Sequence, residues 1–590
     1  APTDVAQVLL TIVAQRTGYP SEMLELDLDL EADLSIDSIK RVEILGAVAE
    51  QLGRGAAGGV EQLPENLVAI KTLRGIIDAL RPLVEAAVAA PAEAPAAAAP
   101  SPGDRADAAA PSVERYVVEL APTKRANGAW SLAEREIGVV GAAPPLAGKL
   151  LEGLAAAGSK AHPQADNTAN GRLDALVDLT PMRADWSPDD VPALFGRVRH
   201  ALVTGASHVL VAGMAPAAQS GGGSALAPPA AGVSGMIRSL SKEWPDRQVR
   251  FAYFPPRLPA DVLARTILDE LNSADDADVV EYPREGERHV PRVVAAQRNG
   301  NGSDGSDAGV ALGRESVVLL TGGARGITAR IALELARRYG CRLELVGRTP
   351  PPAPADDADL RDAADEVAVR RALIARGGRK PAEIEAECAR VLAAREVRAT
   401  LAARAAAGAT PTYHQVDVRD ADAVAALVAR IYAERGRLDG VVHGAGVIED
   451  KLARDKTPES FARVFDTKVN GAIGIARSVR DDVGFIVFFS SIAATFGNRG
   501  QSDYAAANDY LDRLAATLKR RLAGRVLSIN WGPWGGAGMV SPELEREYAK
   551  RGVGLIDPDA GAASFVDELL HGPADEAQVI LMRGDPARLT

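Results

Sequence analysis

The stretch that decides the fold of the second half of this chain is Val487-Phe-Phe-Ser490-Ser491-Ile-Ala-Ala-Thr-Phe-Gly-Asn-Arg-Gly-Gln-Ser-Asp-Tyr504-Ala-Ala-Ala-Asn508-Asp-Tyr-Leu-Asp512. An apolar run ends in two serines, a Gly-containing segment follows, and Tyr504 opens an Ala-rich segment, which predicts a strand, a loop and a helix. Ser491 at the strand end and Tyr504 on the helix can converge on one carbonyl oxygen, and Asn508 shares the helical face of Tyr504. Such a pair suits proton donation to a carbonyl that is being reduced. These residues alone fit a loop hydroxyl and a half-buried aromatic ring equally well.

The spacing of these residues resembles that of the short-chain dehydrogenase/reductase family, and most closely that of ketoreductases in modular polyketide and fatty-acid synthases. The usual reductase has Lys four residues after the Tyr and Asn on an earlier helix, whereas synthase ketoreductases exchange the two. This chain has the exchanged form, with Asn508 after the Tyr and Lys468 in Thr467-Lys-Val-Asn-Gly471. The resemblance implies that Tyr504 donates the proton, Ser491 holds the oxygen and Lys468 lowers the pKa of the phenol from ~10. It also implies that Asn508 orients the lysine or a relay water.

Length and composition set the broad class. A chain of 590 residues with 47% hydrophobic and 25% charged residues indicates a globular protein of several domains. No apolar run approaches the ~18 residues of a membrane helix, so we expect no membrane partner. Because the chain begins at Ala1 without Met or a signal-peptide pattern, it is interpreted as an excised piece of a longer, cytoplasmic polypeptide. Its two cysteines, Cys341 and Cys388, provide neither a disulfide framework nor a metal site.

The charge distribution points to a small acidic domain at the N-terminus. The net charge of -12 argues against nucleic acid as a partner. Residues 1–85 hold 14 Asp and Glu against 7 Lys and Arg, a net charge of -7, which is more than half of the total. Apolar residues at helical spacing predict helices over residues 5–16 and around 67–83, so this domain should be a small helical bundle.

Within this bundle, Leu34-Ser-Ile-Asp37-Ser38-Ile39-Lys-Arg-Val-Glu-Ile resembles the acyl carrier protein signature. From the residues alone, Asp37 and Ser38 also fit a simple helix cap. The resemblance implies that Ser38 carries a covalent 4'-phosphopantetheine arm that holds the acyl chain as a thioester. Acidic residues around Ser38 would then face basic patches on partner enzymes. We therefore predict an acyl carrier domain at residues 1–85.

An Ala- and Pro-rich segment, residues 86–112, is predicted to be a linker, because it has too few large apolar residues to bury a core. From 113 to 296, short apolar runs alternate with helical stretches, which predicts a parallel α/β sheet. The strands are expected at 117–118, 137–140, 175–179, 209–212 and 251–254. After the second of these the loop holds Pro144 and Pro145, which lack the amide donors of a phosphate cradle, so this half should bind no nucleotide. It resembles the truncated structural subdomain of synthase ketoreductases. A second linker is predicted at 297–313.

The last region, 314–590, is predicted to be the catalytic subdomain, a doubly wound parallel sheet that binds NADPH. A strand at 317–321, a Gly-rich turn and a helix over 329–338 form an anion site for a pyrophosphate. Arg348 follows the next strand where an acidic residue would favour NADH, and Arg suits a 2'-phosphate. The predicted cofactor-binding residues come from this turn, from Arg348 and from two further strand ends that match the family: Thr321, Gly322, Gly323, Arg325, Gly326, Ile327, Arg348, Asp417, Val418, Gly444, Ala445 and Gly446. The family's final Gly of the turn is Thr328 here, and His443 is given no chemistry.

Between 350 and 412 the sequence predicts a largely helical insertion. Ile384, Cys388, Val391 and Leu392 follow one stripe, which is interpreted as a packing face. The insertion resembles that of ketoreductases from iterative, polyunsaturated-fatty-acid-type synthases. The segment that follows Ile529-Asn-Trp-Gly-Pro-Trp534-Gly, up to Met539, resembles the lid over substrate and cofactor.

Stereochemistry is predicted from two positions. Ile448-Glu449-Asp450 resembles the Leu-Asp-Asp motif of ketoreductases that form a D-hydroxyl, and Phe496 stands where the L-forming type has Trp. Asp450 is therefore the predicted stereocontrol residue.

These features together predict an NADPH-dependent 3-ketoacyl reductase acting on a carrier-tethered acyl chain. Ketosynthase, acyltransferase and dehydratase domains and a phosphopantetheinyl transferase are the expected partners. Two alternatives stay open at this point. The reductase half could be a silent scaffold in a carrier and docking module, or the chain could be a free-standing reductase of a small ketone.

Overall fold

The computed structural model describes residues 5–17, 19, 23–30, 44, 48, 70, 72–88, 112–126, 128, 130–164, 172–215, 228–297, 310–353, 355–536 and 542–589. The chain forms two compact units, one of residues 1–110 and 349–399, the other of residues 111–348 and 400–590. Each unit has its own apolar core.

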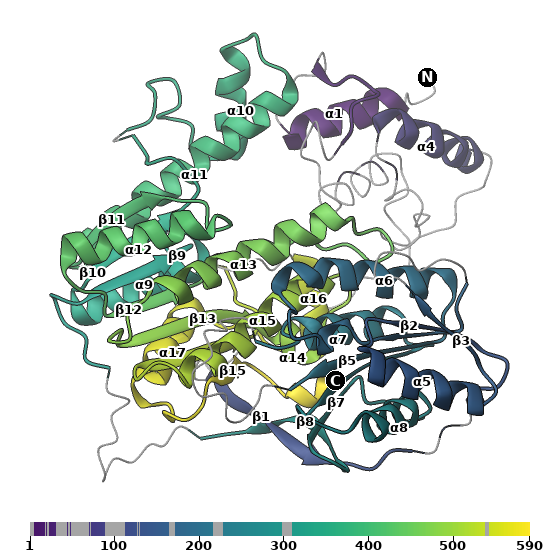
Figure 1. Cartoon of the computed structure of the whole chain (residues 1–590). Helices are drawn as coiled ribbons and strands as arrows, with labels where there is room; N and C mark the ends of the chain where they lie inside the picture. The colour runs from purple at the N-terminus through teal and green to yellow at the C-terminus, as the bar shows by residue number, and fades with distance from the viewer. Residues whose placement is uncertain are drawn as a thin grey trace. The chain divides into compact units, whose positions relative to one another are not determined.

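The larger unit contains the predicted doubly wound parallel sheet. Its strands are β9 (Val317–Thr321), β10 (Arg342–Gly347), β11 (Thr410–Gln415), β12 (Gly440–His443), β13 (Phe485–Ser491), β14 (Arg525–Trp531) and β15 (Gln578–Met582). They lie in the order β11-β10-β9-β12-β13-β14-β15, and every neighbouring pair is parallel (Figure 1). The order reverses between β9 and β12, which is the place where such sheets bind ligands at the carboxyl ends of the strands.

Helices cover both faces of this sheet because its strands are apolar on both sides. Val317 and Leu319 of β9 belong to one core cluster, with α12 (Ala421–Arg435), α13 (Pro458–Ser478) and α15 (Ser502–Lys519). Val318 and Leu320 face the opposite cluster, with α9 (Gly326–Tyr339) and α17 (Pro558–His571). The strand's period of two thus assigns alternate residues to alternate helix layers.

The preceding half of the unit is a second parallel sheet. It contains β2 (Glu136–Val140), β3 (Lys160–Gln164), β4 (Ala175–Asp178), β5 (His208–Met214), β6 (Gln248–Phe254) and β7 (Val279–Arg284), in the order β3-β2-β4-β5-β6-β7. Helices α5 (Pro144–Ala156) and α8 (Ala260–Leu271) cover one face, and α6 (Val191–Thr204) and α7 (Val233–Glu243) cover the other. The sequence did not predict β3, because Lys-Ala-His-Pro-Gln contains no apolar run, and the strand lies at the sheet edge.

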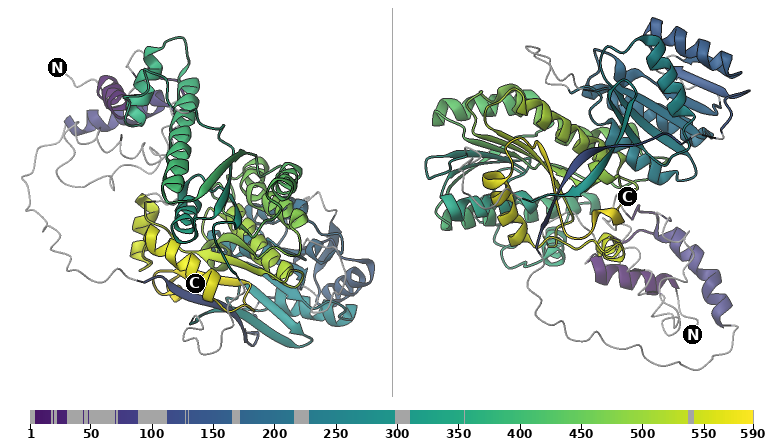
Figure 2. Two further views of the ribbon diagram at one scale, coloured as in Figure 1. Left: turned by 90° about the vertical axis from the view of Figure 1, so that its left-hand side faces the viewer. Right: turned by 90° about the horizontal axis from the view of Figure 1, so that it is seen from below.

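Two antiparallel strands join the halves into one sheet of fifteen described strands. These are β1 (Glu114–Pro122), which pairs with both β15 and β8, and β8 (Glu287–Ala295), which returns along β7 (Figure 2, right). The prediction of a purely parallel sheet over 113–294 is therefore wrong for the first expected strand, which lies in β1. Buried Arg115 of β1 fixes this junction, because its guanidinium donates to both carboxylate oxygens of Glu568 on α17 at 2.8 and 3.1 Å.

The helix layer is also continuous across the two halves. Phe195 of α6 stacks on Phe461 of α13, with ring centroids 4.6 Å apart. Helix α7 packs against α15 so closely that a Cβ on Gly235 would overlap the carbonyl oxygen of Ala505. One apolar cluster therefore extends under α6, α7, α15, α13 and α12.

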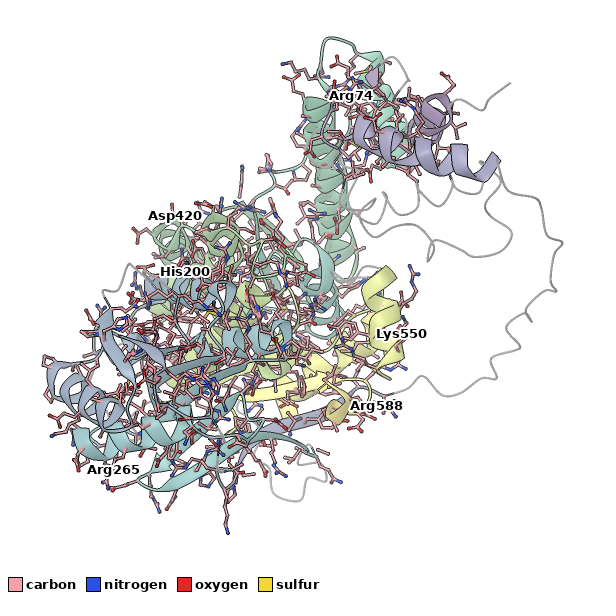
Figure 3. All side chains as sticks on the ribbon, turned by 90° about the vertical axis from the view of Figure 1, so that its right-hand side faces the viewer. Arg74, His200, Arg265, Asp420, Lys550 and Arg588 are labelled. Atoms are coloured by element: carbon pink, nitrogen blue, oxygen red, sulfur yellow. The ribbon has the colours of Figure 1, made fainter. Side chains whose placement is uncertain are left out.

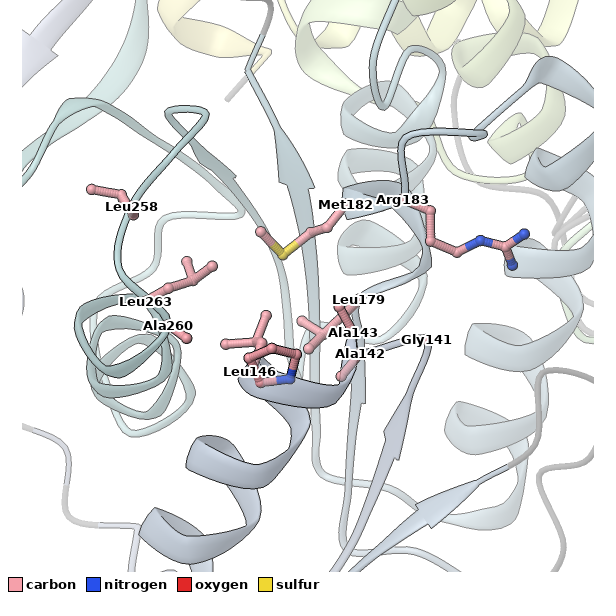
Figure 4. A pocket seen from close by; sticks show the side chains of 11 residues that line it. Gly141, Ala142, Ala143, Leu146, Leu179, Met182, Arg183, Leu258, Ala260 and Leu263 are labelled. Atoms are coloured by element: carbon pink, nitrogen blue, oxygen red, sulfur yellow. The ribbon is translucent and has the colours of Figure 1, made fainter.

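At its own switch point, between β2 and β4, the first half contains a cavity of about 750 Å³ (Figure 4). Its lining is mainly apolar, with Leu146, Leu179, Met182 and Leu263 among its side chains and Arg183 at its edge. The loop that would hold a phosphate leads into α5, which begins with Pro144 and has no side-chain cap. The absence of a nucleotide site in this half stays a prediction, and these proline positions are its physical basis.

The smaller unit contains helical segments of the N-terminal region and of the insertion. They are α1 (Val5–Thr17), α4 (Leu73–Val88), α10 (Glu366–Ala375) and the N-terminal part of α11 (Pro381–Ala406). Arg74 of α4, labelled in Figure 3, donates to the Asp27 carboxylate at 2.5 and 2.8 Å. Helix α1 covers the predicted residues 5–16. Helix α4, predicted around 67–83, begins at Leu73 and ends at Val88, within the predicted linker of residues 86–112. Ser38 lies outside the described residues.

Candidate active site

The predicted catalytic stretch forms strand β13, a short helix and helix α15. Ser491 ends β13, and its Oγ accepts a hydrogen bond from Ala493 N at 3.2 Å, which caps the helix α14 (Ile492–Phe496). The sequence predicted a loop here. The helix forms because its residues include two alanines and a serine cap, and it ends at Gly497, where φ is 69°. Tyr504 lies in the first turn of α15, as predicted.

Three side chains from three elements lie around Tyr504. The Lys468 ammonium of α13 lies 5.5 Å from the centroid of the Tyr504 ring and donates to Phe489 O at 2.7 Å. Asn508 donates from Nδ2 to Tyr504 O at 2.7 Å, and its Oδ1 has no hydrogen-bond partner among the described residues although it is buried. The Ser491 side chain lies near enough to Tyr504 to lower the pKa of its phenol. The structure thus brings the four predicted catalytic residues together, and the unpartnered amide oxygen of Asn508 fits the predicted role in holding a relay water.

Burial dominates the ionisation of Tyr504 and raises its pKa above the ordinary 10. Hydrogen bonds with Ser491 and Asn508 lower this pKa, and the nearby Asp450 carboxylate raises it further, with a net upward shift. The expected lowering of the phenol pKa by Lys468 is therefore wrong for the protein alone. A raised pKa keeps the phenol protonated at neutral pH, which is the form that a proton donor needs.

Lys468 is buried, and desolvation lowers its pKa to about 8, with a partial opposing effect of the Asp512 carboxylate. The ammonium is therefore charged below about pH 8 and neutral above it. Because a phenol that gives up its proton leaves a phenolate, the adjacent cation favours proton donation only while it is charged.

We predict from this that kcat/KM for ketone reduction falls as the pH rises through about 8. The fall comes from Lys468, since the raised pKa of Tyr504 leaves the phenol protonated over the same range. Initial rates with a diffusible 3-ketoacyl thioester at saturating cofactor, measured in steps between about pH 6 and 10, give the profile. A rate that stays constant between about pH 7 and 10 would show that the lysine charge has no part in the reaction.

Behind the catalytic residues lies a buried polar network that the sequence did not predict. Asp512, on the same helix as Tyr504, accepts hydrogen bonds from Ser528 Oγ at 2.6 Å and Asn530 Nδ2 at 2.9 Å. Asn530 Nδ2 also lies 3.1 Å from Ser491 O, so the network fixes the backbone of the residue that holds the substrate oxygen. Burial raises the pKa of Asp512 to about 7. The only sequence signal was the period of four residues in Tyr504, Asn508 and Asp512.

His443 connects the cofactor strand to the lysine helix. Its Nδ1 lies 2.7 Å from Thr321 Oγ1 and its Nε2 lies 2.8 Å from Lys468 O. Complete burial lowers its pKa to about 3, so the ring is neutral. A neutral ring that donates from Nε2 to the carbonyl accepts at Nδ1 from the threonine hydroxyl. The histidine thus positions Lys468, which agrees with the interpretation that gave it no chemistry.

The Gly-rich turn after β9 has the shape that a pyrophosphate requires. Gly322 has φ of 72°, and a Cβ there would lie 3.0 Å from Ala445 N, so only glycine fits without strain. Gly326 opens α9 with φ of 57°, and Arg325 caps the helix without a side-chain hydrogen bond. The first amides of α9 are therefore available to an anion.

Thr328, which replaces the family's final glycine, is accommodated by another glycine. A Cβ on Gly444 would overlap Thr328 Oγ1, so Gly444 leaves the space that the threonine fills. From α11, Thr400 Oγ1 donates to Ala324 O at 2.8 Å and fixes the turn from outside. The sequence offered no signal for Thr400.

The residues predicted to contact the adenosine end lie together at the ends of β10 and β11. Arg348 is exposed directly after β10, and its carbonyl accepts from Gln415 at 3.4 Å. The Asp417 carboxylate accepts from Arg419 at 2.6 Å, and this hydrogen bond, with a smaller effect of Arg348, lowers the pKa of Asp417. Arg419, which pairs with Asp417, is a second exposed cation that the sequence analysis missed, and exposed cations after these strands suit a 2'-phosphate.

We predict that NADPH is used better than NADH and that Arg348→Ala reduces this preference about ten- to hundred-fold, the effect of one charge-assisted hydrogen bond. The measurement is the ratio of kcat/KM for the two cofactors. Arg342→Ala is the matched control, because Arg342 begins the same strand and pairs with exposed Glu315 at 2.6 Å. Equal efficiency of the two cofactors in the unsubstituted protein would contradict the assignment of Arg348.

The loop that carries Asp450 is held through both of its acidic side chains. Asp450 accepts two hydrogen bonds from Gln501 Nε2, at 3.0 and 3.1 Å. Glu449 points instead toward α13, where Arg463 donates to it at 2.7 and 2.8 Å. Glu449 therefore has an anchoring contact of its own, and Asp450 is the acidic residue of the motif that contacts the segment before Tyr504.

Helix α7 of the first half holds this loop and the segment before Tyr504 together. The Glu243 carboxylate accepts from Ala453 N at 2.7 Å and from Gly500 N at 3.1 Å. Buried Lys456 and Asp503 form an ion pair at 2.6 Å beside them. Helix α7 belongs to the half without a predicted cofactor site. This half thus positions both the loop that carries Asp450 and the segment before Tyr504.

Ser38 and residues 537–539 of the predicted lid lie outside the described residues. Within the part of the chain that the structure describes, no group of three or more metal-ligating side chains was found. In the same part, no helix combines the length and the apolar character needed to cross a membrane.

Comparison with known families assigns both parts of the chain. Residues 316–536 match the KR domain family, and residues 7–80 match the family of the phosphopantetheine attachment site. The chain is therefore a carrier domain followed by a ketoreductase domain, the combination that the sequence predicted. These families confirm the predicted cofactors, a covalent phosphopantetheine and NADPH.

Relatives among curated proteins are large synthases. A polypeptide of the polyunsaturated fatty acid synthase of Thraustochytrium sp. is 28% identical over 649 residues, which cover 96% of this chain and 22% of that protein. Polyketide synthase PksN of Bacillus subtilis is 34% identical over 185 residues, covering 30% of this chain and 3% of that protein. The chain thus spans less than a quarter of either relative.

Solved structures of ketoreductases share the fold. An A1-type ketoreductase superimposes with a TM-score of 0.61 at 23% identity, covering 80% of this chain and 94% of that one. A ketoreductase domain from the bacillaene assembly line superimposes with a TM-score of 0.58 at 23% identity, covering 81% of this chain and 99% of that one. These matches confirm the fold of two Rossmann-like halves, and the match to the phosphopantetheine attachment family supports the carrier region before them.

Proposed function

We propose that this chain reduces the C3 ketone of a 3-ketoacyl thioester that is carried on the phosphopantetheine arm of its own carrier domain. The observation that supports this best is the arrangement around Tyr504. A protonated phenol, the Ser491 hydroxyl and the Lys468 ammonium gather at the carboxyl end of β13, in the half that contains the Gly-rich turn. This arrangement fits proton donation to a carbonyl oxygen next to a dinucleotide site.

Each side chain has a separate task in the proposed reaction. Bound NADPH supplies the hydride that adds to C3, and the carbonyl oxygen takes the Tyr504 proton, so the ketone becomes a 3-hydroxyacyl thioester. Ser491 donates to the same oxygen and orients it. Lys468 stabilises the phenolate that Tyr504 leaves behind, and the Oδ1 of Asn508, unpartnered among the described residues, holds the water that returns a proton.

Intact-mass spectrometry of the loaded chain tests this proposal. A 3-ketoacyl-pantetheine group is transferred to the chain from its coenzyme A ester by a phosphopantetheinyl transferase, and NADPH is then added. We expect the mass of the loaded chain to rise by that of two hydrogen atoms, in step with NADPH oxidation. An unchanged mass, with the loaded thioester intact, would contradict the proposal.

The same experiment separates the two alternatives. A silent reductase scaffold would be loaded but would oxidise no NADPH, with either the tethered substrate or a diffusible thioester. A free-standing reductase of small ketones would oxidise NADPH with such ketones and would not be loaded at all.

The partners follow from the chemistry of a tethered substrate. Other domains of a synthase are the coarse assignment that the multidomain relatives support. In particular, a ketosynthase and an acyltransferase must build the 3-ketoacyl group, and a dehydratase can consume the 3-hydroxyacyl product. A phosphopantetheinyl transferase must attach the arm, and all of these steps belong to the cytoplasm.

We predict mainly the D-3-hydroxyacyl product. Asp450, held by Gln501, guards one side of the segment before Tyr504, whereas Phe496 is 6% exposed and packs with Ile580 and Met582 in a core cluster. Because Phe496 packs into this core, its side chain leaves the substrate side of the site free. The L-forming type has a Trp at the corresponding position. Chiral chromatography of the hydrolysed product gives the ratio of enantiomers. A predominantly L product would show that the match at 448–450 is coincidental.

A further inference from the structure

The proposed reaction leaves one feature of the sequence unused, the apolar stripe of the insertion. Ile384, Cys388 and Val391 of α11 are 1%, 2% and 6% exposed, so the interpretation of this stripe as a packing face needs a partner. In the smaller unit these residues share one apolar cluster with residues of the carrier region, among them Leu9, Ile12 and Val13 of α1 and Ile76 and Ile77 of α4. The insertion and the carrier region thus bury apolar surface in common.

A polar contact at the centre of this cluster involves a single carrier side chain. Tyr19 is 1% exposed, and its hydroxyl donates to Glu385 Oε1 at 2.7 Å and lies 3.1 Å from Pro381 O. The Arg370 guanidinium lies 5.8 Å from the centroid of the Tyr19 ring. The phenol of Tyr19, from the carrier region, therefore contacts both a cation and an anion of the insertion, Arg370 and Glu385.

The insertion side of this contact is organised around the ion pair of its two helices. Arg370 of α10 donates from Nη2 to Glu385 Oε2 at 3.0 Å and to Glu366 Oε1 at 2.5 Å, and its side chain is only 3% exposed. A buried pair of this kind contributes little to stability against an apolar replacement, but it fixes which side chain fits beside it. Tyr is well suited, since its ring accepts a cation on its face and its hydroxyl donates to a carboxylate.

We propose that helices α10 and α11 form a docking site, built into the ketoreductase, for the chain's own carrier domain, with Tyr19 as the specific contact. The site holds the carrier in cis and returns it to one place between visits to other enzymes. This docking goes beyond the proposed function and does not rest on it.

Distance measurement in the full chain tests the docking. Spin labels are placed at Gln7→Cys on α1 and Ala399→Cys on α11, both exposed positions. The native Cys341 is 0% exposed and needs no replacement, because a buried thiol is not labelled in the folded chain. Cys388 belongs to the cluster that the carrier region covers, so Cys388→Ala is included in every labelled chain. In the labelled chain without further substitutions, we expect pulsed electron paramagnetic resonance to give one narrow distribution of distances between the two labels.

Three variants locate the contact. Tyr19→Phe and Glu385→Ala each remove the hydrogen bond between these two side chains. We expect a broad distribution of distances, with the ratio of docked to undocked carrier lowered about ten- to hundred-fold. Glu387→Ala is the matched control on α11, since Glu387 pairs with exposed Arg390 at 2.5 Å and the narrow distribution should persist. Quantitative phosphopantetheine loading of each variant checks that its carrier domain is folded.

Other outcomes would overturn the proposal. A broad distribution in the unsubstituted chain would mean that the carrier does not dock, and a narrow one that survives Glu385→Ala would mean that Tyr19 is not its specific contact. A distance between singly labelled chains mixed together would place the contact between two copies. Rates with a diffusible thioester stay equal in all variants, so a defect in the reductase itself, which would affect the proposed function, is recognised separately.

Discussion

Replacing Tyr504 with Phe is expected to lower the turnover of a 3-ketoacyl thioester by about 10²- to 10⁴-fold, the usual contribution of a positioned acid. The ring and its packing under the Lys468 ammonium remain, and only the proton and the hydroxyl are lost. Because the hydroxyl acts on the substrate oxygen, the dissociation constant for NADPH should change by less than about twofold. Single-turnover rates and cofactor titration by fluorescence measure the two quantities.

Tyr510→Phe is the matched control for this change. Tyr510 lies on the same helix, it is buried, and its hydroxyl has no hydrogen-bond partner among the described residues. Its loss should leave both the rate and the cofactor affinity unchanged. If Tyr504→Phe retained most of the turnover, the proton would come from another group, and the neighbouring Ser491 would be the first candidate.

The elements that surround Tyr504 were predictable because their signals are local. The apolar run of β13, the serines at its end and the Ala-rich start of α15 lie within one short segment, residues 487–512. The turn after β9 has a strand before it and a helix after it, and its glycines are required by backbone geometry, as the φ of Gly322 shows. Periodicity and turn chemistry act over short distances, and a sequence displays them directly.

The residues that hold the site together were not predictable, because their contacts join distant parts of the chain. Glu243 binds amides that are 210 and 257 residues away. His443 bridges Thr321 and Lys468, and Asp512 gathers side chains from β14. A buried acid or a neutral histidine has no periodic signature, so such a residue is recognised only when its partners are in place.

The pairing of β1 with β15 shows the same limit for the fold. The expected strand at 117–118 exists, but its direction depends on a partner that lies near the other end of the chain. Apolar alternation indicates a strand and says nothing about its neighbour. For the same reason the stripe on α11 could be identified as a packing face, whereas its partner could not be named.

The pKa of Tyr504 shows a different limit. The resemblance implied that a cation lowers it, and in the folded chain burial outweighs the other effects and raises it. Desolvation depends on how completely the surrounding elements enclose the ring, which no motif records. A phenol with a raised pKa is a weaker acid, so proton donation depends on the stabilisation of the phenolate by the Lys468 ammonium.

Ser38→Ala is expected to abolish attachment of phosphopantetheine completely. The Asp37-Ser38-Ile39 signature lies within the region that matches the phosphopantetheine attachment family, and the transferase requires a hydroxyl nucleophile at one position. Incubation with coenzyme A and a phosphopantetheinyl transferase should add one arm to the unsubstituted chain and none to the variant, as measured by intact mass. Ser35→Ala is the matched control, because Ser35 lies three residues earlier in the same segment and should leave the loading intact.

The same variant separates the carrier from the reductase. Without an arm, Ser38→Ala can reduce no tethered ketone, but its rate with a diffusible 3-ketoacyl thioester should equal that of the unsubstituted chain, because Tyr504, Ser491 and Lys468 belong to the other unit. An arm found on the variant would show that another hydroxyl is the attachment site. A loss of activity with the diffusible substrate would show that the serine has a task in the reductase, which no feature of the active site requires.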